Sequence, residues 1–327
     1  MKRLAVAIVL TALFATAAAA QQLSKVQFGF DGYAMTSGPL NYADKQGLFK
    51  RFGLDLTPVY IEGGSVLTRA VIGGSIEIAQ NGYTPAAGAA VQGADIVLIG
   101  SIVNKLPYQL VVKTSITSAQ QLKGQSIAIS RYGSSTDAAV DFALKTLGLG
   151  RNDVKVLQLG GAATRVAAAM SGQVVATVEQ YPETAELTRH GFHVLADITD
   201  VAGDYPNTAY VTTRTFLKNR PDVVKKFIMA ISTAIHEFKT KPTVAIPLTQ
   251  KFLDVKDEAN LKAAYEYFIK VYPDIPRPSL KGVELVLQEL AVREPKAATL
   301  KPEQIVDLST IEELEREGFF AKLFRQK

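Results

Sequence analysis

The segment from Ser130 to Asp137 has residue types that could hold a charged ligand. A predicted strand ends there, Gly133 permits a tight turn, and three hydroxyl residues open a predicted helix. Free backbone N–H groups and the positive helix end would bind a carboxylate, sulfonate or phosphate, and Arg131 could add charge. The alternative is that Ser134 only caps the helix, as serine often does. The predicted ligand residues here are Arg131, Tyr132, Gly133, Ser134, Ser135 and Thr136.

Four further clusters of small, polar and aromatic residues follow predicted strands. Ligands of open α/β sheets collect outside the carboxyl ends of the strands, so these clusters are candidate walls of one site. Tyrosine suits such a site because it offers apolar area and a hydrogen-bonding tip. The alternatives are structural: Gly63–Ser65 could be a plain turn, Asn81 a turn residue, Tyr83 a packing residue and Glu179 a solvated strand end. The predicted ligand residues are Tyr33, Thr36, Ser37, Gly64, Ser65, Asn81, Tyr83, Thr84, Glu179 and Tyr181.

Catalytic patterns are missing from the sequence. The three histidines, His190, His193 and His236, do not have the spacing of metal ligands. The chain has no Gly-x-Ser-x-Gly elbow, no phosphate-loop lysine motif and no dinucleotide-binding glycine motif. It also has no cysteine, which excludes disulfides, thiolate nucleophiles and cysteine-bound metals. We therefore predict no catalytic residue, no metal site and no cofactor.

The first twenty residues have the pattern of a cleaved secretory signal. Lys2 and Arg3 precede an apolar run from Leu4 to Phe14, and a small-residue tail ends at Ala20. The run is about half the roughly 20 residues that a bilayer-spanning helix needs. Cleavage near Ala20 predicts a periplasmic protein, and losing the two basic residues lowers its formal charge from +5 to +3. Such a small excess, with no basic block, gives no reason to expect a nucleic-acid partner.

The elements that would position these residues alternate between strand and helix from Val26 to about Val211. This alternation is typical of α/β layers with largely parallel sheets. Beyond Thr213 the pattern becomes helical. The predicted strands are Val26–Phe30, Leu54–Ile61, Ile76–Gln80, Ile96–Ser101, Ser126–Ser130, Val154–Leu159, Val174–Val178 and Ala209–Val211. The predicted helices are Pro39–Gln46, Val66–Ile72, Pro85–Gln92, Ser134–Leu147, Ala163–Met170, Pro182–His190, Pro221–Lys239, Val244–Phe252, Glu258–Val271 and Ser279–Val292.

An internal repeat indicates two lobes built on one plan. After a shift of 98 residues, Gly63 falls on Gly161 and Gly74 falls on Gly172. In both copies a helix ends at glycine, a short strand follows, and a polar residue and a tyrosine end the strand. Two such lobes would place their strand-end clusters face to face. We predict that residues 21–113 and 207–327 form one discontinuous lobe and residues 114–206 form the other.

Six short motifs occur in a fixed order along the chain: Asn41–Leu56, Gly74–Ala79, Gly93–Val97, Leu122–Ile129, Gly133–Ser135 and Ser171–Val174. Together they resemble the nitrate/sulfonate/taurine-type solute-binding proteins of ABC transporters, which are related to proteins that bind thiamine-pyrimidine precursors. The resemblance covers about Val26 to Phe216 well and the helical tail loosely. Glu77 and Val175 stand where that family has aspartate.

The resemblance implies a two-lobed periplasmic-binding-protein fold of type II, with two crossing strands between the lobes and a helical C-terminal part. It implies a non-enzymatic protein, expected to be a monomer, that closes on a small ligand and delivers it to an ABC permease in the inner membrane. With the turn at Gly133, we expect an anionic organic ligand such as a sulfonate or carboxylate. The alternatives are a secreted enzyme on the same fold and a binding subunit that feeds a membrane sensor.

Overall fold

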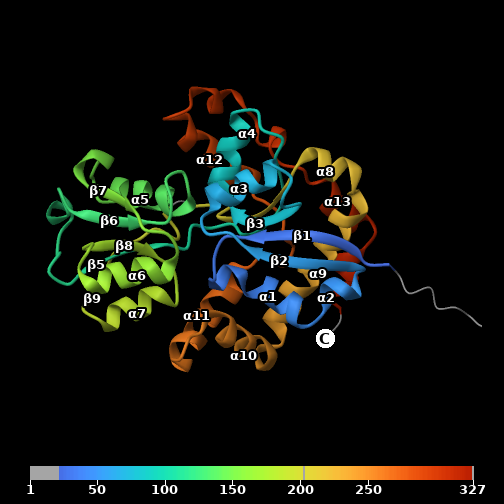
Figure 1. The fold of residues 1–327 in the computed structure, drawn as a ribbon, viewed down its shortest axis with the longest axis horizontal. Helices are drawn as coiled ribbons and strands as arrows, with labels where there is room; N and C mark the ends of the chain where they lie inside the picture. The colour runs from blue at the N-terminus through green and yellow to red at the C-terminus, as the bar shows by residue number, and fades with distance from the viewer. Residues whose placement is uncertain (1–21, 202, 326–327) are drawn as a thin grey trace, which may run out of the picture.

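The protein consists of two α/β lobes and a helical C-terminal part (Figure 1). The computed structural model describes residues 22–201 and 203–325, so the predicted secretory signal lies outside the described residues. Within those ranges no helix combines the length and apolar character needed to cross a bilayer. The predicted α/β class is confirmed.

The first lobe is built on a five-stranded mixed sheet. The strand Thr208–Thr212, fourth in the sheet, pairs antiparallel with both neighbours, whereas the other pairings in the sheet are parallel. The strand in the sequence Val97–Val103 is buried along its whole length, as expected for a sheet covered on both faces. In spatial order the strands are β2 (Leu54–Tyr60), β1 (Ser24–Phe30), β3 (Ile78–Gly82), β10 (Thr208–Thr212) and β4 (Val97–Val103).

The second sheet repeats the same plan. Its antiparallel strand also lies fourth in the order, which confirms the two copies indicated by the internal repeat. In spatial order the strands are β7 (Lys155–Gln158), β6 (Ser126–Ile129), β8 (Ala176–Glu179), β5 (Gln109–Lys113) and β9 (Phe192–Asp197). Strand β9 is not among the predicted strands, because this partly exposed edge strand lacks a continuous apolar run.

Helices cover both sheets, and the C-terminal helices pack on the first lobe. The long helix Pro221–Thr240 begins with proline at its first turn and places Phe227 5.5 Å from Phe28 of the sheet, ring centre to ring centre. The helices before it are α1 (Gly38–Lys45), α2 (Leu48–Arg51), α3 (Gly64–Ile72), α4 (Tyr83–Val91), α5 (Ser135–Thr146), α6 (Ala162–Ser171), α7 (Glu183–Arg189) and α8 (Arg214–Asn219). The remainder are α9 (Pro221–Thr240), α10 (Pro242–Leu253), α11 (Glu258–Val271), α12 (Leu280–Ala291), α13 (Ser309–Arg316) and α14 (Phe319–Leu323).

The chain crosses between the sheets twice, and the two crossovers run side by side. The Ile198 N–H donates to the Tyr108 carbonyl (3.1 Å), and the Tyr205 N–H donates to the Asn104 carbonyl (2.9 Å). Strand β5, which the predicted division assigns to the first lobe, pairs in the second sheet. The division at residue 114 stays a prediction, and the pairing of β5 places the first crossover before Gln109.

Apolar packing continues from one lobe to the other beside the crossovers. The buried Tyr205 hydroxyl lies 2.8 Å from the Thr84 hydroxyl of α4, and its ring packs edge-on against Phe142 of α5 at 5.6 Å. Buried side chains of both lobes therefore form one continuous cluster. This contact holds the lobes together on the side of α4 and α5.

A tight contact on the first sheet gives a test of the packing. A Cβ added to Gly29, near the end of β1, would lie 2.3 Å from Leu67 Cδ1 and 3.0 Å from Ile76 Cγ2. Gly29→Ala should therefore lower the free energy of unfolding by about 1–3 kcal/mol through overpacking. Gly32→Ala is the control, because an added Cβ there meets no atom within 4 Å. Denaturant titration that found equal losses in both variants would contradict this packing.

Candidate functional site

A cleft of about 630 Å³ lies between the two lobes. Its volume is in the range that suits a small organic ligand. Strands of both sheets end at its walls, in agreement with the rule that ligands of α/β sheets bind beyond the carboxyl ends of the strands. The strand-end residues that line it are Asp31, Glu62 and Gly82 from the first lobe and Ser130, Gly161 and Gln180 from the second.

The cleft brings together seven of the predicted ligand residues. These seven come from both lobes and from four of the five predicted clusters. They are Tyr33, Thr36, Gly64, Ser134, Ser135, Thr136 and Glu179. The remaining nine do not line this cleft: Ser37, Ser65, Asn81, Tyr83, Thr84, Arg131, Tyr132, Gly133 and Tyr181.

Several of those nine residues have structural contacts instead. Asn81 is fully buried, and its amide donates to the Gly64 carbonyl (3.2 Å) and to Thr68 Oγ1 (2.7 Å). Tyr83 is 1% exposed in the core. The Tyr132 hydroxyl donates to the Val156 carbonyl (2.8 Å) next to the edge strand β7. The burial of Tyr83 agrees with its packing alternative, whereas Asn81 lies inside β3 and is therefore not a turn residue.

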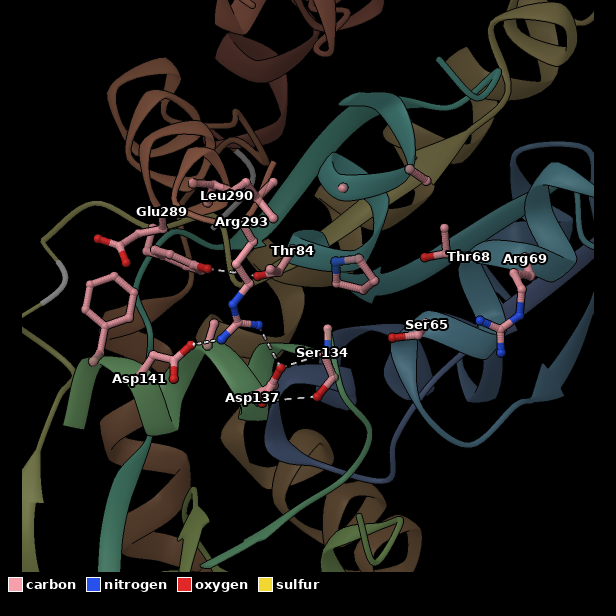
Figure 2. Close-up of a pocket in the computed structure, with 18 of the residues that line it drawn as sticks. Ser65, Thr68, Arg69, Thr84, Ser134, Asp137, Asp141, Glu289, Leu290 and Arg293 are labelled. Carbon is pink, nitrogen blue, oxygen red and sulfur yellow. Dashed lines mark hydrogen bonds and ion pairs between the residues drawn. The ribbon is translucent and has the colours of Figure 1, made fainter. Parts of the chain in front are cut away.

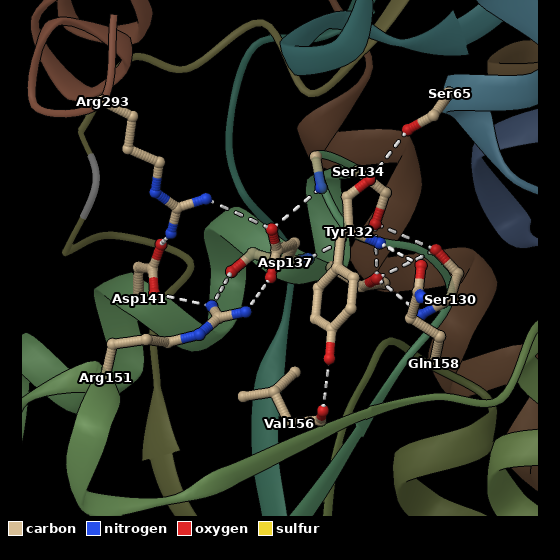
Figure 3. A network of polar contacts seen from close by, with 12 residues as sticks. Ser65, Ser130, Tyr132, Ser134, Asp137, Asp141, Arg151, Val156, Gln158 and Arg293 are labelled. Atoms are coloured by element: carbon tan, nitrogen blue, oxygen red, sulfur yellow. Dashed lines mark hydrogen bonds and ion pairs between the residues drawn. The ribbon is translucent and has the colours of Figure 1, made fainter.

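The turn at Gly133 already holds a carboxylate of the protein itself (Figure 3). The Gly133 N–H donates to Asp137 Oδ2 (2.8 Å), and the Asp137 N–H donates to Ser134 Oγ (3.4 Å). The capping role of Ser134 is therefore confirmed. Arg151 pairs with Asp137 and with Asp141 (2.7 Å for the second pair). The groups expected to attract a ligand anion are thus occupied in part by Asp137.

A second pocket, of about 310 Å³, lies between α3, α4, α5 and the end of α12 (Figure 2). It includes the predicted residues Ser65, Thr84 and Gly133 in its lining. Arg293 enters it from the segment after α12 and pairs with Asp141 (2.6 Å) and Asp137 (3.5 Å) of α5. Because α12 packs on the first lobe and α5 belongs to the second, this pocket is closed by ion pairs between the lobes. The larger cleft, where the strand ends of both sheets meet, is the candidate ligand site.

A buried ion pair forms part of the cleft wall in the second lobe. Arg165 of α6 donates to both oxygens of Glu179, from Nε at 2.9 Å and from Nη2 at 2.6 Å. Its Nη1 donates to the Gly160 carbonyl (2.8 Å), and Thr177 Oγ1 donates to Glu179 Oε1 (2.6 Å). Both charges need these partners because burial removes them from water. Arg165 therefore brings little free positive charge to the cleft.

Two other carboxyl groups of the cleft are held away from water. Burial raises the pKa of Asp31 to about 6, although the Gly82 N–H donates to its Oδ2 at 3.1 Å. Burial also raises the pKa of Glu183, at the start of α7, to about 7, and the nearby Glu179 carboxylate adds to this effect. Both groups would gain from a ligand that donates hydrogen bonds or carries positive charge.

Some residues that line the cleft are not among the predicted ligand residues. Asp31, Glu62 and Gln180 are adjacent to predicted clusters, so extending each strand exit by one or two residues would have found them. Arg165 lies within an Ala-rich helix and had no signal beyond its charge. Residues 253–257 and Asn260, between and within α10 and α11, reach the cleft from the helical tail. No strand-end pattern could have indicated them.

Comparison with known proteins gives a family and a fold. The profile described as "NMT1/THI5 like" matches residues 35–245. A protein of Brucella abortus, provisionally named a binding protein, is 29% identical over 229 residues, which is 67% of this chain and 68% of that protein. The periplasmic aliphatic sulphonate binding protein SsuA of Escherichia coli is similar in structure, with a TM-score of 0.69, 21% identity, and coverage of 86% of this chain and 98% of that one. The ligand-binding component of an ABC-type import system from Staphylococcus aureus, solved with zinc bound, has a TM-score of 0.71, 14% identity, and coverage of 89% and 98%.

The pKa of Glu183 predicts how stability depends on pH. Its folded-state pKa of about 7 exceeds the ordinary value of 4.5, so between these values the folded state binds more protons than the unfolded state. Ionisation of Glu183 therefore destabilises the folded state in full above about pH 7, and this cost falls with pH and disappears below the ordinary pKa of 4.5. Without ligand, Glu183→Gln should be more stable than the wild type by up to about 3 kcal/mol at about pH 8 and nearly equal to it at about pH 4. Melting curves that differed by the same amount at both pH values would contradict this assignment.

Proposed function

The chain belongs to the NMT1/THI5-like family and has the periplasmic-binding-protein fold, and on this basis we propose that it is the solute-binding component of an ABC-type importer. The observation that carries the proposal is the cleft between two sheets of identical strand order, lined by strand ends of both. A ligand held there touches both lobes at once.

Binding by this arrangement works through closure of the lobes. The two crossovers are the only chain connections between the sheets among the described residues, and they run side by side in opposite directions, which suits a hinge. The lobes already touch at the cleft: the Gly161 N–H donates to Glu62 Oε1, and the Ser65 hydroxyl donates to the Tyr132 carbonyl (3.1 Å). A ligand favours this closed form to the extent that it contacts it better than the open form.

The predicted cleaved signal and the similarity to a periplasmic sulphonate-binding protein support a periplasmic location and a permease in the inner membrane as partner. In the described part of the chain no three His, Asp or Glu side chains are grouped to hold a metal ion. By similarity to SsuA and to the binding component of an ABC-type import system, we propose that the ligand leaves the protein unchanged.

The anionic ligand expected from the sequence has three basic groups in the cleft lining, Arg165, Arg189 and Lys256. The pairing of Arg165 with Glu179, and of Arg189 with Glu186 and Asp257, weakens that support and leaves Lys256 as the base without such a pair in the described part of the chain. The proposal of a solute-binding component depends on the cleft and the hinge, and holds for a ligand of either charge.

Native mass spectrometry of the protein from the periplasmic fraction should find one small molecule per chain. Adding that molecule back to the stripped protein should reduce the radius of gyration in small-angle X-ray scattering, because the lobes close on it. The molecule should be recovered intact after incubation, and deletion of the gene should abolish its uptake.

Two results would contradict this function. Recovery of a product in place of the molecule would identify an enzyme. Unchanged uptake after deletion, together with loss of a cellular response to the molecule, would identify a subunit that feeds a sensor.

A further inference from the structure

Three buried amide oxygens line the cleft without a hydrogen-bond partner among the described residues. They belong to Gln180, Asn207 and Asn260, whose side chains are 8%, 2% and 8% exposed. Buried polar atoms normally have partners, so each of these oxygens indicates a group that is supplied from outside the chain. All three accept hydrogen bonds.

The hydrogen bond made by the Asn260 amide group establishes that its free atom is an acceptor. Its Nδ2 donates to the Pro182 carbonyl (3.2 Å), which can only accept, so the free Oδ1 is an acceptor. The Nδ2 of Asn207 donates to Thr208 Oγ1 (3.2 Å), a hydroxyl that could also donate, so this contact does not fix the orientation of that amide. The Ser135 hydroxyl is also buried in the cleft without a partner, but a hydroxyl can donate or accept and does not discriminate.

The charge of the cleft agrees with the free acceptors. Seven acids line it against three bases, which leaves an excess of negative charge in a chain of positive net charge. Two of the three bases already have carboxylate partners: Arg165 pairs with Glu179, and Arg189 pairs with Asp257 and Glu186. Glu183 has no salt bridge in the described part of the chain. An excess of one sign of charge in a cleft raises the local concentration of ligands of the other sign.

An aromatic wall stands beside the acids. Tyr33 and Tyr60 line the cleft with their ring centres 4.9 Å apart, and Phe252 packs 5.1 Å from Tyr33 behind them. Tyrosine faces attract cations as well as apolar groups. A ligand that combines an apolar part with positive charge would find a partner for each.

We infer that the cleft binds an organic nitrogen cation whose N–H groups donate to Asp31, Glu183 and the free amide oxygens of Gln180, Asn207 and Asn260. Ammonium and amidinium groups and protonated nitrogen heterocycles have this chemistry. The inference rests on the proposed function, since it assigns the ligand class of the same cleft. It replaces the anion expected from the turn at Gly133, where Asp137 already supplies the negative group.

The test uses probes of one size and different charge. Benzylamine and benzamidine are cations at about pH 8, benzyl alcohol is neutral, and benzoate and benzenesulfonate are anions. Calorimetric titration into protein freed of its own ligand in denaturant and refolded should give binding at least about tenfold tighter for the cations than for the anions.

Two substitutions of like shape connect the affinity to the acids. Asp31→Asn keeps an oxygen that can accept from the Gly82 N–H, and Glu183→Gln breaks no salt bridge, so both variants should fold. Each should weaken cation binding by about tenfold or more, because a charge-assisted hydrogen bond becomes a neutral one. Asp222→Asn, on α9 outside the cleft lining, is the matched control and should leave the affinity unchanged.

Tighter binding of benzoate or benzenesulfonate than of the cations would overturn the inference. So would the absence of cation binding at millimolar concentration, or full cation affinity in both acid variants. In each of these cases, closure on the molecule extracted from the periplasmic protein would leave the importer function intact. Cation binding without closure in solution scattering would have the reverse meaning, supporting the ligand class and contradicting the function.

Discussion

The geometry of the parallel strands determines where this protein can offer polar groups to a ligand, namely at the carboxyl ends of the strands. Backbone groups inside each sheet are paired, so polar side chains and free backbone groups collect where the strands end. Because both sheets have the same strand order, two sets of strand ends face one cavity, and the chain crosses between the sheets only beside it. The lining, the hinge and the closed contacts at Glu62 and Ser65 all follow from this arrangement.

Within that cavity, the groups left over for a ligand are those that the protein does not satisfy itself. The helix N-terminus at Ser135 is served by Ser134 and Asp137, and the Arg165 guanidinium is bound by Glu179. What remains is mostly acceptors: carboxylates with raised pKa and amide oxygens without donors, against the single base Lys256. A basic residue seen in a sequence therefore does not predict an anionic ligand until it is known whether a carboxylate of the protein pairs with it.

Much of the fold was predictable because it depends on local patterns. Strand and helix periods, the proline that opens α9 and the glycine spacing of the repeat each report on their own neighbourhood. The site was predictable only in part. Ser135 and Glu179 were found because they follow strands, but the burial of Tyr83 depends on how helices cover a central strand. Asn260 reaches the cleft from a helix about 80 residues beyond Glu179, and such a contact has no local signal.

The crossovers also determine the order in which the two sheets can be completed. Gln109 and Asp197, at the two ends of the second sheet's segment, lie opposite each other on paired strands, so that sheet is made of one continuous stretch of chain. The first sheet has β10 between β3 and β4, and β10 lies more than a hundred residues after both. During synthesis the second sheet can therefore close while the first still lacks an inner strand. The first lobe can complete its sheet only after β10, which follows the whole second sheet in the sequence, has been synthesised.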